Sequence, residues 1–91
     1  MGLLDGKVLL VSGGTQGVGA AVARAAVREG AAVTISGRRR EVGEKVAADL
    51  GVRFVAADVA DPEQALASVA AVVAEHGRID ALVNAAGLTD R

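Results

Sequence analysis

Apolar and polar residues follow two alternating patterns along the chain, one typical of buried strands and the other of amphipathic helices. Continuous apolar runs predict strands over residues 7–11, 31–36 and 52–56, and a fourth within the segment 79–87, which ends in a turn of small residues. Between these runs the apolar residues have helical spacing, which predicts helices over 17–29, 40–50 and 61–76. Strands that alternate with helices indicate an α/β fold, with a parallel sheet that carries helices on both faces.

The helix ends carry recognisable signals. A glycine follows each helical segment, which is the usual place for a left-handed residue to end a helix. Asp61 and Pro62 predict the start of the third helix, and Gln64 is placed to complete a capping box. The predicted apolar faces comprise Val18, Val22, Ala25 and Ala26 in the first helix and Leu66, Val69 and Val73 in the third.

The composition narrows the class of protein. The 91 residues carry a formal net charge of −1, which argues against a general binder of nucleic acid or of membrane surfaces. The sequence contains no cysteine, so disulfide, thiol-redox and zinc–thiolate chemistry are excluded. Because no apolar run approaches the roughly 20 residues of a membrane span and the N-terminus lacks a signal peptide, we expect a cytoplasmic protein.

The segment SGGTQGVG, residues 12–19, is the first candidate site because it lies between an apolar strand and a helix. Glycines leave the backbone bare, so a diphosphate can approach it while the helix supplies unpaired N–H groups and the positive end of its dipole. The spacing Gly13-x-x-x-Gly17-x-Gly19 differs from the G-x-G-x-x-G of the standard dinucleotide fingerprint. A glycine-rich turn with only a structural purpose is the alternative.

This loop resembles the cofactor loop of the short-chain dehydrogenase/reductase family, written T/S-G-x-x-x-G-x-G. Asp58-Val59 and the sequence NAAG at 84–87 are similar to two further elements of that family, and their order and spacing match over the whole chain. The resemblance implies an incomplete Rossmann-type sheet of strand order 3-2-1-4. In that fold, residues 1–91 form the NADP(H)-binding N-terminal half of a domain whose catalytic half lies outside this chain.

The same resemblance assigns roles to individual positions. Asp58 is expected to accept a hydrogen bond from the adenine amino group, and Val59 to line the adenine ring. The family's N-N-A-G element has Ala85 in place of its second Asn, so only the other three positions are carried over. The complete set of predicted cofactor-binding residues is Ser12, Gly13, Thr15, Gln16, Gly17, Val18, Gly19, Arg38, Arg39, Asp58, Val59, Asn84, Ala86 and Gly87.

The residues after the second predicted strand indicate which dinucleotide is preferred. An NAD site places an acid there to hold the ribose 2′-hydroxyl, but no acid occurs between Gly30 and Arg40. Arg38 and Arg39 stand in its place, and guanidinium groups suit a 2′-phosphate through planar, charge-assisted hydrogen bonds. NADP(H) is therefore favoured over NAD(H), whereas Arg40 is interpreted as part of a solvated helix start.

No catalytic or metal-binding residue is predicted. The family uses a Ser and a Tyr-x-x-x-Lys on later elements, and this sequence contains no tyrosine. His76 lies in the last turn of a helix, where a cation complements the helix dipole, so we assign it no catalytic role. We therefore expect the N-terminal part of a short-chain oxidoreductase that interconverts a small alcohol and carbonyl compound.

Two alternatives stay open at this stage: a non-catalytic dinucleotide-binding module or truncated inactive product, and a fragment that does not fold. The resemblance to oligomeric relatives suggests a homo-oligomeric parent protein.

Overall fold

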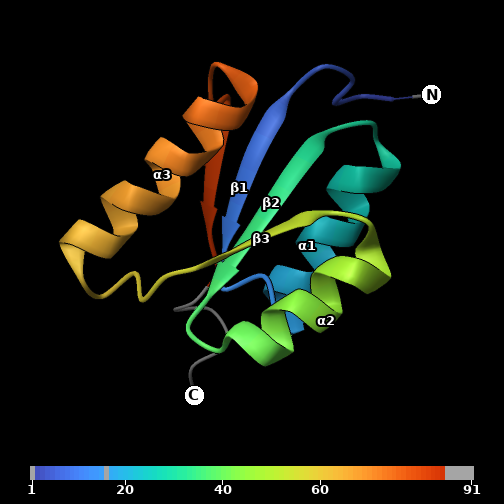
Figure 1. The fold of residues 1–91 in the computed structure, drawn as a ribbon. Helices are drawn as coiled ribbons and strands as arrows, with labels where there is room; N and C mark the ends of the chain where they lie inside the picture. Colours follow the sequence, from blue (N-terminus) through green and yellow to red (C-terminus); the bar gives the residue numbers. More distant parts are fainter. Residues whose placement is uncertain (1, 16, 86–91) are drawn as a thin grey trace.

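The computed structural model describes residues 2–15 and 17–85 (Figure 1). Strands and helices alternate in the predicted order. Their bounds are β1 (Val8–Ser12), α1 (Gly17–Arg28), β2 (Ala32–Gly37), α2 (Arg40–Leu50), β3 (Arg53–Ala56), α3 (Pro62–His76) and β4 (Ala81–Asn84).

The four strands form one parallel sheet in the order β3-β2-β1-β4, which confirms the predicted Rossmann-type arrangement. In the register of this sheet, Leu10 of β1 is paired with Thr34 of β2 on one side and with Leu82 of β4 on the other. β3 and β4 therefore form the two edges of the sheet in the described part of the chain, as predicted for the fourth strand.

Each face of the sheet has its own apolar core. Leu9 and Val11 of β1 pack with buried residues of α1 and α2, whereas Leu10 faces the other way and packs with Val72 of α3. Figure 1 shows the result: α1 and α2 cover one face of the sheet, and α3 covers the opposite face. The predicted covering of both faces is thus confirmed.

The buried face of α1 differs in part from the prediction. Gly19, Ala23 and Ala26 are buried, whereas Val18 is 44% exposed and Ala25 is also exposed. Small residues let the helix backbone approach the sheet closely, so the contact line follows Gly and Ala rather than the larger apolar side chains. Only Ala26 of the predicted face is fully buried.

The buried face of α3 also differs in part from the prediction. Ser68 and Val72 are its buried residues, whereas Leu66 is 71% exposed and Val73 is 39% exposed. Val69 packs against the core, as predicted. The physical reason lies in the width of the sheet, because Leu66 lies beside the edge strand β4 and no further strand of the described chain covers it.

Candidate functional site

The carboxyl ends of the four strands bring the predicted positions to one edge of the sheet. Ser12, the last residue of β1, is in register with Ser36 of β2 and Asn84 of β4. The backbone N–H of Ala57, just after β3, donates to the carbonyl of Gly37 at 2.8 Å. The glycine loop, the arginine pair, Asp58 and the end of β4 therefore all lie at this edge, where α/β proteins bind ligands.

Hydrogen bonds to β2 hold the start of the glycine loop. The backbone N–H groups of Gly13 and Gly14 both donate to the carbonyl of Ser36, at 2.9 and 3.3 Å. These two donors are already used, so a diphosphate on this loop has to be bound by later N–H groups. Gly17 begins α1 with φ 58°, and the first-turn N–H groups of a helix have no partners within it.

Two glycines of the loop are required by close packing. A Cβ on Gly19 would overlap the carbonyl oxygen of Gly13, so the bare backbone there lets α1 begin directly against the loop. A Cβ on Gly14 would lie 2.7 Å from Cγ2 of Ile35. Gly14 was not among the predicted site residues, although the density of glycine in the segment was a signal for it.

The two arginines after β2 are exposed. Within residues 2–15 and 17–85, neither Arg38 nor Arg39 forms a side-chain hydrogen bond or an ion pair. Arg40, in contrast, contacts Glu44 at 3.2 Å, which agrees with its interpretation as part of a helix start. Arg39 is the N-cap residue of α2 but makes no side-chain capping bond.

Asp58 is fixed by the start of α3. Its Oδ1 accepts a hydrogen bond from the N–H of Ala60 at 3.0 Å, and its own N–H donates to Oε1 of Gln64 at 2.8 Å.

The predicted cap of α3 is confirmed, since Asp61 accepts from the N–H of Glu63 at 3.0 Å. The predicted capping box is wrong, because Gln64 reaches back to Asp58 and not to the N–H of Asp61. Gln64 thus supports Asp58, whereas the capping pattern predicted that it would bind the N–H of Asp61.

A cavity of about 260 Å³ lies between α3 and the β1–β4 side of the sheet. It is mostly apolar, but the hydroxyl of Ser12 is buried and has no hydrogen-bond partner among the described residues. Its lining contains three of the predicted site residues, and the full set is Leu10, Ser12, Val59, Ala65, Leu66, Ser68, Val69, Leu82 and Asn84.

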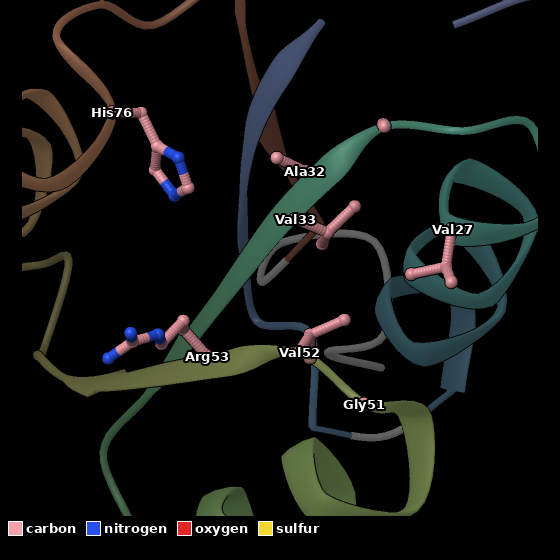
Figure 2. A pocket seen from close by; sticks show the side chains of 8 residues that line it. Val27, Ala32, Val33, Gly51, Val52, Arg53 and His76 are labelled. Carbon is pink, nitrogen blue, oxygen red and sulfur yellow. The ribbon is translucent and has the colours of Figure 1, made fainter. Parts of the chain in front are cut away.

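A second cavity, of about 270 Å³, lies at the opposite, amino end of β2 and β3. Figure 2 shows His76 and Arg53 on one side of β2 and Val27 on the other. Arg53 forms an ion pair with Glu75 of α3 at 2.6 Å. His76 is therefore remote from the carboxyl edge, at the C-terminal end of α3.

Asp80 is the residue with a clear electrostatic perturbation in the described structure, and it also lies at the amino end of the sheet. The N–H of Val8 donates to its carboxylate at 2.7 Å, which holds the pKa of Asp80 below its ordinary value of 3.8. Arg78 lowers this pKa further, against a partial desolvation that raises it. Asp80 therefore joins β4 to β1 and takes no part in the candidate site.

Three predicted residues, Gln16, Ala86 and Gly87, lie outside the described residues. Across residues 2–15 and 17–85, no cluster of His, Cys, Asp and Glu has the arrangement of a metal site. None of the described helices is long and apolar enough to cross a membrane.

Comparison with known proteins identifies this arrangement. Residues 7–91 match the family described as short chain dehydrogenase. The chain belongs to that family. It is 47% identical over 90 residues to D-threitol dehydrogenase of Mycolicibacterium smegmatis, covering 93% of this chain and 35% of that enzyme. It is also 40% identical over 89 residues to the NADP-dependent (R)-specific alcohol dehydrogenase of Lentilactobacillus kefiri, with shares of 93% and 35%.

Solved structures of short-chain dehydrogenases have the same fold. A crystal structure of a short chain dehydrogenase from Mycobacterium smegmatis superposes with a TM-score of 0.88 at 36% identity, over 92% of this chain and 37% of the other. A citronellol catabolism dehydrogenase from Pseudomonas aeruginosa gives a TM-score of 0.86, also at 36% identity. The chain thus spans about a third of the length of the relatives it matches.

Proposed function

We propose that residues 1–91 form the NADP(H)-binding part of a short-chain oxidoreductase, which interconverts an alcohol and a carbonyl compound by hydride transfer. The observation that favours NADP(H) over NAD(H) is the pair of exposed arginines directly after β2, in a segment with no acid between Gly30 and Arg40. The relative from Lentilactobacillus kefiri is an NADP-dependent alcohol dehydrogenase, which supports this choice.

The described residues fit such a cofactor along the carboxyl edge of the sheet. The close contact of Gly19 with Gly13 leaves no side chain between the loop and α1, so a diphosphate can lie on the first turn of that helix. Arg38 and Arg39 are free to bind the 2′-phosphate. Asp58 uses Oδ1 for Ala60, and a carboxylate can accept a further hydrogen bond, here from adenine.

The positions after β3 and at the end of β4 also have proposed roles. Val59 lines the adenine ring, and Asn84, Ala86 and Gly87 support the cofactor at the end of β4. NADP(H) supplies the hydride when it is bound, while the residues of this chain bind and orient it. The family's general acid–base residue is a tyrosine, and these 91 residues contain none. In this proposal that group therefore comes from outside them.

A second candidate is a module that binds the dinucleotide without turning it over. The lack of tyrosine in the sequence favours this function for the chain as it stands, because the family's acid–base residue is a tyrosine. Both candidates share the cofactor site. They separate in one measurement on the full-length native protein that contains these residues: oxidation of NADPH in the presence of carbonyl compounds supports the first, and binding without oxidation supports the second.

The preference for NADP(H) is tested by measuring the dissociation constants of NADPH and NADH by isothermal titration calorimetry. We expect NADPH to bind at least about tenfold more tightly, because one charge-assisted hydrogen bond contributes about 1.5–3 kcal/mol before salt screening. Arg38→Ala and Arg39→Ala should each weaken NADPH binding by about tenfold or more and leave NADH binding unchanged.

Arg24→Ala is the matched control, since Arg24 is an exposed arginine in α1. It removes the same charge and should change neither constant. Equal affinities for NADPH and NADH in the wild-type chain would refute the NADP(H) preference.

A further inference from the structure

Phe54 of β3 is the only aromatic residue of the chain, and it packs directly on the backbone of α2. A Cβ on Gly43 would overlap the Phe54 ring at Cε1, Cζ and Cδ1. The ring therefore lies flat against the Cα of Gly43, near the start of the helix. Any larger residue at position 43 would force either the ring or the helix to move.

The same ring atom, Cε1, also lies near Gly37 at the end of β2. A Cβ on Gly37 would lie 3.8 Å from Cε1 of Phe54 and 2.9 Å from Cγ2 of Thr15 in the glycine loop. One continuous layer of contacts thus runs from the glycine loop over Gly37 to Phe54 and on to Gly43. Neither Gly37 nor Gly43 was predicted as a site residue, because their close contacts depend on which strands and helices become neighbours.

This layer continues to the arginine pair through the backbone. The N–H of Gly43 donates to the carbonyl of Arg39 at 2.9 Å, in the first hydrogen-bonded turn of α2. Arg39 is the N-cap residue, and Arg38 comes directly after Gly37. Phe54 thus packs on the first turn of α2, which follows directly after the two arginines.

We propose that Phe54 and Gly43 are positioning residues for recognition of the cofactor's 2′-phosphate, a role that depends on the NADP(H) preference proposed above. Guanidinium–phosphate hydrogen bonds require a donor–acceptor distance near 2.7–2.9 Å, so a displaced helix start weakens them. The proposed diphosphate and adenine contacts come from α1 and from the loop after β3. They do not depend on α2, so only the discrimination for the 2′-phosphate should change.

The test compares two ligands that differ in this phosphate, adenosine 2′,5′-bisphosphate and adenosine 5′-monophosphate. Their dissociation constants are measured by calorimetry for the wild-type chain, Gly43→Ala, Phe54→Leu and the double variant. Each single variant should lower the preference for the bisphosphate by about fivefold or more, with the monophosphate constant unchanged within about twofold. The double variant should recover most of the preference, because the added methyl group occupies space that the ring has left.

Gly51→Ala is the matched control. It adds the same methyl group at the other end of α2, where no atom lies within 4 Å of the new Cβ. Its positive φ of 73° makes the variant less stable without moving the helix start, so the preference should stay at the wild-type value. Circular dichroism melts show which variants fold, and Phe54→Leu, which adds no atoms, tests the proposal if Gly43→Ala does not fold.

Two results would overturn the proposal. One is a preference that is unchanged in the folded single variants. The other is an equal loss of affinity for both ligands, which would give the ring a purely structural role. A wild-type chain that shows no preference for the bisphosphate would instead refute the NADP(H) preference itself, so the two failures are distinguishable.

Discussion

Glycines that look alike in the sequence are required for different physical reasons. At Gly19 the carbonyl oxygen of Gly13 occupies the space that a side chain would need. At Gly77, just after α3, the surrounding space is open, and φ of 82° is the constraint. A crowded glycine shapes the candidate site, whereas a left-handed glycine only ends a helix.

Gly19→Ala should therefore lower the free energy of unfolding by about 1–3 kcal/mol, although alanine has the higher helix propensity. It should also weaken NADPH binding, because the loop can no longer lie against α1. Urea unfolding and calorimetry measure the two effects. Gly77→Ala, the control, should reduce stability by about 1 kcal/mol through its backbone conformation and leave NADPH affinity unchanged. Equal NADPH affinities in the two variants would contradict this distinction.

At the scale of elements, side-chain hydrogen bonds join β1 and β4 at the amino end of the sheet, opposite the candidate site. The Asp80 carboxylate, just before β4, accepts hydrogen bonds from the N–H of Val8 in β1 and from Nε of Arg78 at 3.1 Å. Arg78 also donates to the carbonyl of Gly6, which precedes β1. β4 is thus held to β1 by side chains as well as by the ladder between the strands.

The lowered pKa of Asp80 predicts an acid-sensitive contribution to stability. Because the folded-state pKa lies below 3.8, this contribution is fully present above the unfolded-state value and is lost as the pH falls through the folded-state value. The urea midpoint of the wild-type chain should fall between about pH 5 and pH 2.

Asp80→Asn is nearly isosteric and does not titrate, so its midpoint should fall less steeply over the same pH range. Asp58→Asn, at the other end of the sheet, is the control and should keep the wild-type slope, since the carboxylate of Asp58 makes a local contact only. Identical slopes for the wild-type chain and Asp80→Asn would show that Asp80 does not supply this contribution.

At the scale of the whole molecule, α3 and the edge strand β4 leave apolar side chains uncovered. Leu66 is 71% exposed and Leu82 is 57% exposed, and both line the cavity of about 260 Å³. An edge strand beside exposed leucines is a site at which protein chains associate. The formal net charge of −1 provides little repulsion between copies of the chain.

We therefore expect the 91-residue chain to associate at high concentration, and Leu82→Lys to reduce that association. Sedimentation velocity over a concentration series measures the change in average mass. Leu3→Lys is the matched control, because Leu3 is 81% exposed but does not line the cavity. It adds the same charge and should leave association unchanged. If both variants reduce association equally, net charge rather than this surface is responsible.

Much of the fold could be predicted because each element has a strong local pattern. The alternation of apolar runs with helical spacing gave the order of strands and helices, and the Asp61-Pro62 start of α3 was confirmed. The helix faces were predicted less well, since hydrophobicity favoured Val18 and Leu66. In α1 the packed face is set by Gly and Ala, which allow the closest approach of helix to sheet, whereas Leu66 of α3 is exposed because it lies beside an edge strand.

The sequence by itself determined the family, the order of elements and the presence of a glycine loop, an arginine pair and an aspartate after successive strands. These features are local, because each depends on residues close together in the chain. The tertiary structure alone decided that Ser36 binds the loop and that Phe54 packs on Gly43. Those contacts join segments from different elements, so they exist only once the sheet has placed its strands side by side.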